Sequence, residues 1–280
     1  METAAEYTRR ILRTGAKAHK SLGQNFLMDD IVIDRIVQTA IENKSIPIVE
    51  VGPGLGVLTR VLGEKAEKVW AIELDKSKIP VLEKELKGLP VKIVNMNALE
   101  LKLKDIWGQE KGYLIGNLPY YITSPILIHF LSQTESLLGM TVMVQREVAD
   151  RLVAKPGGKD YGVLSVAVQV SAEAEKIFEV TPEAFWPAPK VTSAVVRLRI
   201  RPYPNFDVPE PEFFRVVKAA FSQRRKNLGN SLSSGLSLGK QEAISLLQKV
   251  NISDQRRAET LRIREFLDLT KAYLEQKDIK

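Results

Sequence analysis

Ile-Pro-Ile-Val-Glu-Val-Gly-Pro-Gly-Leu-Gly, residues 46–56, is the stretch that decides the fold of this 280-residue chain. Its first half is a short apolar run rich in β-branched residues, which predicts a buried strand. Its second half is a glycine-rich loop, and a helix is predicted directly after it, from about Leu55 to Glu64. A strand that passes through such a loop into a helix is typical of a doubly wound α/β sheet.

The first 200 residues continue this alternation of strands and helices, which predicts an α/β fold with a doubly wound, mostly parallel sheet. Two later apolar runs, 163–168 and 194–200, have no clear helix between them and are predicted as an antiparallel pair of strands at the end of the sheet. The other predicted strands are 69–72, 91–94, 112–116 and 140–144, and the other predicted helices are 29–41, 76–86 and 125–131.

The composition changes at Arg201-Pro202-Tyr203-Pro204-Asn205, which predicts a linker. Beyond it the apolar residues follow helical spacing only, so a small all-helical C-terminal domain is expected. The predicted domains are a basic N-terminal tail with an entry motif in 1–28, a cofactor-binding α/β domain in 29–202 and a helical domain in 203–280.

The glycine spacing indicates the kind of cofactor. Glycines stand at Gly52, Gly54 and Gly56, whereas the dinucleotide fingerprint G-x-G-x-x-G has its third glycine one position later, where this chain has Val57. The spacing therefore favours S-adenosyl-L-methionine over a nicotinamide dinucleotide. Glu73 closes the next strand, where an acid accepts hydrogen bonds from the ribose hydroxyls of either cofactor; the alternative is a surface carboxylate.

Asn117-Leu118-Pro119-Tyr120 follows the predicted strand 112–116 and carries groups suited to holding an aromatic amine. The Asn117 side chain offers a carbonyl acceptor, and Pro119 forces Leu118 towards an extended conformation that can aim its carbonyl outward. Tyr120 offers a flat face on which a base can stack. Two acceptors on the hydrogens of an adenine amine would free its lone pair to attack. Alone, the tetrapeptide could also be a simple turn.

The net charge of +7 is concentrated in three stretches without any acidic residue, 7–28, 185–206 and 213–241. Concentrated basicity of this kind is expected for a surface that binds phosphates, and it favours a nucleic acid as the partner. The residues predicted to bind RNA are Arg9, Arg10, Arg13, Lys17, Lys20, Arg224, Arg225 and Lys226.

The composition also excludes several classes of function. The chain has no cysteine and only two histidines, so we expect no disulfide, no thiolate site and no metal. No apolar run approaches the roughly 18 residues that span a bilayer, and residues 1–6 do not resemble a signal peptide. A cytoplasmic monomer without a membrane partner is therefore predicted.

Further motifs occur in a fixed order along nearly the whole chain. They are Ser-Leu-Gly-Gln-Asn-Phe-Leu at 21–27, Gln-Arg-Glu-Val-Ala at 145–149, Lys-Asp-Tyr-Gly at 159–162, Phe-Trp-Pro-Ala-Pro-Lys-Val at 185–191 and Phe-Ser-Gln-Arg-Arg-Lys at 221–226. Together with 51–56, Glu73 and 117–121, this set resembles the small-subunit (16S) ribosomal RNA adenine dimethyltransferases that confer kasugamycin sensitivity.

The resemblance implies a Rossmann-like methyltransferase that adds two methyl groups to each of two adjacent adenosines in a hairpin loop near the 3′ end of small-subunit rRNA. It implies that Asn25, Leu27 and Asn117 contact the cofactor and that Phe185 closes the far face of the base. Asn97 replaces the acid that usually accepts from the cofactor's adenine amine, and its side-chain carbonyl can accept the same bond without charge.

The implied partners are small-subunit rRNA and the immature small ribosomal subunit. The basic N-terminal tail is expected to be mobile without RNA and to become ordered on binding. Two alternatives remain: an enzyme methylating large-subunit rRNA, of the macrolide-resistance type, and a ribosome-assembly checkpoint in which methylation is secondary.

Overall fold

The structure is a computed structural model, and it describes residues 2–19, 22–201, 206–223 and 225–278. The chain forms two compact units; among the described residues, the first contains the strands and the second is helical. The first unit is Met1–Asp150 with Ala172–Pro202, and the second is Arg151–Ser171 with Tyr203–Lys280.

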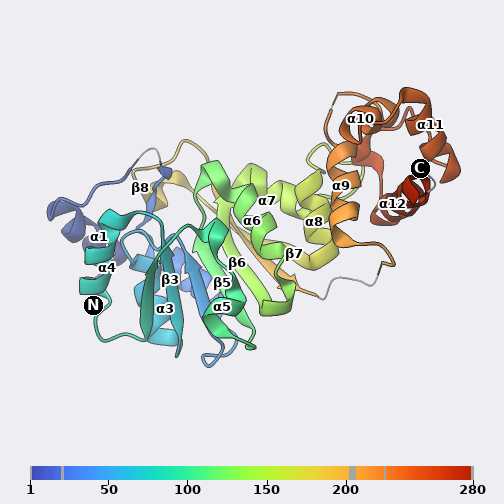
Figure 1. Cartoon of the computed structure of the whole chain (residues 1–280). Helices are drawn as coiled ribbons and strands as arrows, with labels where there is room; N and C mark the ends of the chain where they lie inside the picture. Colours follow the sequence, from blue (N-terminus) through green and yellow to red (C-terminus); the bar gives the residue numbers. More distant parts are fainter. Residues whose placement is uncertain (1, 20–21, 202–205, 224, 279–280) are drawn as a thin grey trace. The chain divides into compact units, whose positions relative to one another are not determined.

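A seven-stranded sheet forms the centre of the first unit (Figure 1). Its order is β4-β3-β2-β5-β6-β9-β7, in which neighbours from β4 to β6 are parallel and the last two strands are antiparallel. This confirms the predicted doubly wound, mostly parallel sheet. The strands are β2 (Ile48–Val51), β3 (Val69–Glu73), β4 (Val91–Asn95), β5 (Gly112–Asn117), β6 (Leu137–Gln145), β7 (Ala172–Val180) and β9 (Ser193–Ile200).

Helices cover both faces of the sheet (Figure 1). The second helix begins at Asp30, because the Asp29 side chain accepts a hydrogen bond from the Val32 N–H, as the acidic pair predicts. One face is covered by an apolar core that α1, α2 and α3 share with Ile48, Ile115 and Met143 of the sheet. The helices are α1 (Ala4–Arg13), α2 (Asp30–Ala40), α3 (Val57–Lys65), α4 (Ile79–Glu85), α5 (Leu103–Trp107), α6 (Thr123–Leu131) and α7 (Arg146–Val153).

The direction of the strand order reverses between β2 and β5, which lie side by side. From β2 the chain builds outward to β3 and β4, and from β5 it builds in the opposite direction to β6. The loops after two such strands diverge and leave a crevice at their carboxyl ends, where α/β sheets bind ligands. Here that crevice lies between the loop after Val51 and the loop after Asn117.

The N-terminal segment differs from the mobile tail that we expected. Thr3 caps α1 in a capping box with Glu6, so the helix has a defined start. Its apolar side packs into the core of the first unit, where Tyr7 and Ile11 are buried. The Tyr7 hydroxyl donates to the Leu55 carbonyl at 3.0 Å and thereby anchors α1 to the glycine loop. The basic residues of this segment predict a solvated tail, whereas its apolar residues lie on one side of a helix.

The predicted strand 163–168 is wrong, because Val163–Ser171 forms helix α8. Periodicity cannot separate a short buried strand from a buried helix when nearly every position is apolar. The edge strand that pairs with the outer side of β9 is the following segment, β7, whose exposed charged residues suit the edge of a sheet. The predicted domain boundary changes as well, since residues 151–171 belong to the helical unit rather than to the α/β unit.

The second unit is an all-helical bundle with its own apolar core, as expected beyond the linker. Phe213 of α9, Leu232 of α10 and Phe266 of α12 are buried in this core, together with Val166 of α8. Its later helices are α9 (Glu210–Ala220), α10 (Leu228–Gly235), α11 (Lys240–Lys249) and α12 (Ile263–Asp278).

Candidate active site at the switch point of the sheet

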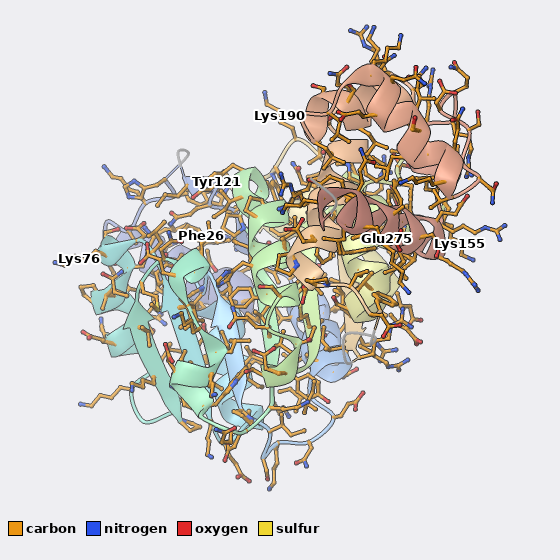
Figure 2. All side chains as sticks on the ribbon, turned by 45° about the vertical axis from the view of Figure 1, so that its right-hand side comes forward. Phe26, Lys76, Tyr121, Lys155, Lys190 and Glu275 are labelled. Carbon is orange, nitrogen blue, oxygen red and sulfur yellow. The ribbon has the colours of Figure 1, made fainter. Side chains whose placement is uncertain are left out.

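A cavity open to solvent lies at the crevice between β2 and β5. The sequence motifs that were predicted separately meet in its wall: the entry motif, the glycine loop, the end of β3 and the loop after β5. Figure 2 labels Phe26 and Tyr121, which both belong to this wall. The predicted site residues that line the cavity are Asn25, Gly52, Gly54, Glu73, Asn97, Asn117, Leu118, Pro119 and Tyr120.

The glycine loop approaches the cavity with backbone that other residues rarely adopt. Gly52 and Gly54 have φ angles of 73° and 59°, in the left-handed region. A Cβ at Gly54 would stand 3.1 Å from the Phe26 ring, so a side chain there would displace the ring. The loop is therefore shaped for the close approach of a ligand, which suits a cofactor site.

Glu73 ends β3 with a carboxylate that is 5% exposed and lines the cavity. One oxygen accepts from the Gly54 N–H at 3.0 Å and the other from the Asp75 N–H at 2.8 Å. Burial raises the pKa of the Glu73 carboxyl, and the two backbone bonds oppose that rise. Each carboxylate oxygen has a further lone pair, so the group can still accept from two hydroxyls.

Asn117, the last residue of β5, is fixed by the entry motif. Its Nδ2 donates to the Asn25 carbonyl at 2.9 Å. A carbonyl can only accept, so this bond requires the amide nitrogen to face Asn25 and leaves the Asn117 Oδ1 as an acceptor. The sequence predicted an acceptor at this position but not the residue that orients it.

The rest of the Asn-Leu-Pro-Tyr motif is held by the neighbouring strands. The Leu118 N–H donates to the Met143 carbonyl of β6 at 3.0 Å, which fixes the end of β5. The Tyr120 hydroxyl lies 2.6 Å from the hydroxyl of Ser193, the first residue of β9. Burial raises the pKa of Tyr120. The Tyr120 ring therefore presents a fixed aromatic surface to the cavity.

Two predicted site residues, Leu27 and Phe185, do not line the cavity. They lie opposite each other in a short antiparallel ribbon of β1 (Phe26–Leu27) and β8 (Phe185–Trp186), and both are buried in the core. Residues directly opposite in such a ribbon share a face, so Trp186 is on the face of Phe26, which does line the cavity. Trp186 is 42% exposed, and it rather than Phe185 offers an accessible ring on that face.

Asn97 lies in the cavity wall, as expected, and also caps a short helical turn. Its Oδ1 accepts from the Leu99 N–H at 3.1 Å. A carbonyl oxygen has two lone pairs, so one remains for a ligand amine. The side-chain oxygen of Asn97 can therefore still accept from the cofactor's adenine amine, and this role remains a prediction.

Residues 15–272 match the family model described as ribosomal RNA adenine dimethylase. The chain belongs to this family. Ribosomal RNA small subunit methyltransferase A of Desulfitobacterium hafniense (strain DSM 10664 / DCB-2) is 67% identical, over 99% of this chain and all of that protein. The protein of the same name from Clostridioides difficile (strain 630) is 44% identical, over 89% of each chain.

Solved structures agree on the fold. A dimethyladenosine transferase from Plasmodium falciparum superposes with a TM-score of 0.73 over 90% of this chain and 98% of that one, at 23% identity. The 23S rRNA methyltransferase ErmE gives a TM-score of 0.63 over 89% and 99%, at 28% identity. The Rossmann-like methyltransferase core and the helical C-terminal region are thus those of ribosomal RNA adenine dimethylases.

The basic residues predicted for RNA lie in both units of this dimethylase. Arg9 and Arg13 of α1, and Lys17 after it, are exposed. Arg10 is already engaged, since its guanidinium pairs with Glu2 and Glu85, each at 2.8 Å. In the second unit Arg225 and Lys226 are exposed between α9 and α10, whereas Lys20 and Arg224 lie outside the described residues.

Several cavity residues of the dimethylase were not predicted from the sequence. Tyr121 is 53% exposed and Leu74 is 48% exposed, although both are large and apolar. Their exposure at a cavity is a signal that appears only in the structure. Phe26 and Gln24 belong to the entry motif, but the sequence predicts no role for either of them.

Within the part of the chain that the structure describes, no group of three or more His, Cys, Asp or Glu side chains could hold a metal ion. Nor is any described helix long and apolar enough to cross a bilayer.

Glu50 of β2 is a buried acid next to the glycine loop, with 1% exposure. Its Oε2 has no hydrogen-bond partner among the described residues. A buried, unpaired carboxylate is costly, and burial raises the pKa of the Glu50 carboxyl to about 8. The group is therefore protonated in the folded protein at neutral pH.

Replacing this acid should change how stability depends on pH. Because the folded pKa of Glu50 lies above its unfolded value, the contribution of this group to the stability of the wild type is fully present below about pH 4.5 and is lost as the pH rises towards 8. Glu50→Gln removes that loss and should raise the free energy of unfolding by at least about 1 kcal/mol near pH 8.5 but not near pH 4.5. Thermal unfolding of both proteins at the two pH values measures this, and an equal shift at both would contradict it.

Proposed function

We propose that this protein transfers methyl groups from S-adenosyl-L-methionine to the exocyclic amines of two adjacent adenosines in a hairpin loop near the 3′ end of small-subunit rRNA. Each adenosine receives two methyl groups. The observation that carries the proposal is the orientation of Asn117, whose side-chain oxygen is kept as an acceptor in the cavity that also contains Glu73.

The lining of the cavity fits the cofactor. Gly52 and Gly54 provide the close backbone approach, Glu73 would accept from the ribose hydroxyls, and Asn97 would accept from the adenine amine. Asn25 lies beside them in the wall. S-adenosyl-L-methionine, when bound there, supplies an electrophilic methyl group on a sulfonium.

The residues after β5 would hold the target base. An adenosine in an RNA loop is unstacked and can be turned out into a pocket. The Asn117 Oδ1 and the Leu118 carbonyl accept the two hydrogens of its amine, so the nitrogen lone pair becomes available. Tyr120, which lines the cavity, stacks on the ring. Positioning of the two reactants supplies most of the rate, and the amine proton leaves to solvent afterwards.

The relatives favour the small subunit over the large one. The proteins at 67% and 44% identity bear the name of a small-subunit rRNA methyltransferase, whereas ErmE, named for 23S rRNA, is 28% identical. By this proposal the protein acts in the cytoplasm, as a monomer, on an immature small ribosomal subunit.

One experiment tests substrate and product together. The protein is incubated with labelled S-adenosyl-L-methionine and small subunits that lack the modification, and the labelled nucleotides are mapped. Label on two adjacent adenosines of the small-subunit rRNA is the expected result. Label on large-subunit rRNA in a parallel reaction, with none on small subunits, would favour the ErmE-like alternative.

Arg225 and Lys226, which are exposed between α9 and α10, should contribute to RNA affinity through their charges. Each Lys or Arg that neutralises a phosphate releases a counterion, so Arg225→Ala with Lys226→Ala should lower the slope of log affinity against log salt by about two. The matched control is Lys249→Ala with Arg257→Ala, which removes the same charges from exposed positions of the same unit. Filter binding across a salt series measures the slope, and an unchanged slope would show that Arg225 and Lys226 touch no phosphate.

A further inference from the structure

A buried ion pair lies beside the cavity and takes no part in the reaction described above. Lys78 is 1% exposed, and its Nζ lies 3.0 Å from the Oδ2 of Asp75. The same Nζ donates to the backbone carbonyl of Lys17 at 2.7 Å. Burying an ammonium is costly unless its donors are satisfied, and here they bind both a carboxylate and the N-terminal segment. The turn that carries the pair is marked by Lys76 in Figure 2.

Asp75 makes a second connection to the same segment. Its Oδ2 accepts from the Gln24 Nε2 at 3.0 Å, and the Gln24 Oε1 accepts from the His19 N–H at 2.9 Å. Burial would raise the pKa of the Asp75 carboxyl, but hydrogen bonds from Ser77, Gln24 and Lys78 outweigh it and hold that pKa well below its usual value. Asp75 therefore binds Gln24 directly and is joined to the Lys17 carbonyl only through Lys78.

The next residue along the chain after Gln24 belongs to the candidate active site. Asn25 follows Gln24, and its carbonyl is the group that accepts from the Asn117 Nδ2. On the other side, the Asp75 N–H donates to Glu73 at 2.8 Å. One turn thus contacts both the predicted ribose acid and the segment that orients the catalytic amide.

We propose that Gln24, Asp75 and Lys78 are positioning residues, which fix the Asn25 carbonyl and thereby keep the Asn117 side-chain oxygen directed at the target amine. The inference rests on the proposed function for its kinetic consequences. If the Asn25 carbonyl shifts, the Asn117 amide loses the bond that distinguishes its nitrogen from its oxygen. A fraction of the molecules then presents an N–H donor to an amine that needs an acceptor.

Gln24→Leu tests this directly, because Gln24 is only partly buried and its loss removes two hydrogen bonds from the segment. The single-turnover rate at saturating cofactor and RNA should fall about tenfold, the effect of losing one hydrogen bond to a charged group. The cofactor dissociation constant should change less than the rate does, since Glu73 keeps its two backbone donors and Asn25 is one of several residues in the wall. A normal single-turnover rate would overturn the proposal.

A double-mutant cycle distinguishes positioning of Asn117 from a general structural effect. Asn117→Asp retains an acceptor oxygen but has no N–H to donate to Asn25, so orienting that carbonyl no longer helps. In this background Gln24→Leu should slow single turnover by less than about twofold, against about tenfold in the wild type. An equal loss in both backgrounds would mean that Gln24 acts through something other than Asn117.

Hydrogen exchange tests the tether without any methyl transfer. Lys78→Met should speed exchange at the His19 and Leu22 amides at least about tenfold, because the contact with the Lys17 carbonyl is lost. Lys68→Met is the matched control, since Lys68 forms an exposed ion pair with Glu110 at 3.3 Å. Unchanged exchange in Lys78→Met would overturn the tether. A wild-type protein that methylates no rRNA would overturn the proposed function while leaving this exchange result to stand on its own.

Discussion

Asn117→Ala is expected to reduce methyl transfer about a thousandfold, because it removes the side-chain acceptor that holds the amine in line with the methyl group. The same change leaves the glycine loop and Glu73 in place, so the cofactor dissociation constant should stay within about threefold of the wild type. A single-turnover assay with labelled cofactor and unmodified small subunits measures the rate, and calorimetry with the cofactor measures the affinity.

The control for this prediction is Asn43→Ala. Asn43 is an exposed asparagine in the turn before β2, where its side chain accepts from the Ser45 N–H at 3.0 Å. This variant should methylate at the wild-type rate. A near-normal single-turnover rate for Asn117→Ala would remove Asn117 from the mechanism, whatever its effect on steady-state turnover.

Glu73→Gln is expected to weaken cofactor binding about a hundredfold. The carboxylate accepts one backbone N–H on each oxygen, from Gly54 and from Asp75, and still has lone pairs for the ribose. A glutamine has a single oxygen, so its NH2 group would face one of these two N–H donors. The variant thus loses charge at the ribose and also disturbs the loop that contacts the ligand. Equilibrium titration with S-adenosyl-L-methionine measures the loss.

Glu67→Gln is the matched control, since Glu67 is exposed and lies away from the cavity. It should bind the cofactor with wild-type affinity, and equal affinity for Glu73→Gln would contradict the assigned role. The Glu73 variant also separates methylation from assembly. If it restores normal subunit assembly in cells that lack the protein, then binding of the immature subunit matters apart from methylation.

Local patterns in the sequence were sufficient to predict those parts of the structure that depend only on neighbouring residues. The run at 48–51 is buried on both faces because its strand lies inside the sheet, and the glycines that follow have positive φ because the loop turns there. Asn-Leu-Pro-Tyr at 117–120 ends a strand, as predicted, and its residues line a cavity. These features depend on neighbours a few positions away, which a single chain displays directly.

The same kind of evidence failed where burial was decided by distant parts of the chain. Residues 163–168 carry apolar side chains at every position but Ser165, and packing in the second unit makes them part of a helix. The basic segment 4–13 was read from its charge, but the buried side of its helix is fixed by contact with the glycine loop through Tyr7. Phe185 faces inward because its ribbon pairs in one register, and a shift by one residue would exchange it with Trp186.

The sequence by itself thus determined the parallel part of the sheet, the glycine loop and the chemical groups after β5, because periodicity and turn chemistry act over short distances. Only the tertiary structure decided how those groups are oriented. Asn25 is 92 positions from Asn117 and Gln24 is 51 positions from Asp75, yet hydrogen bonds join each pair. Such bonds form because the fold brings the segment before β1 to the carboxyl ends of β3 and β5, and no local pattern records which partner will be there.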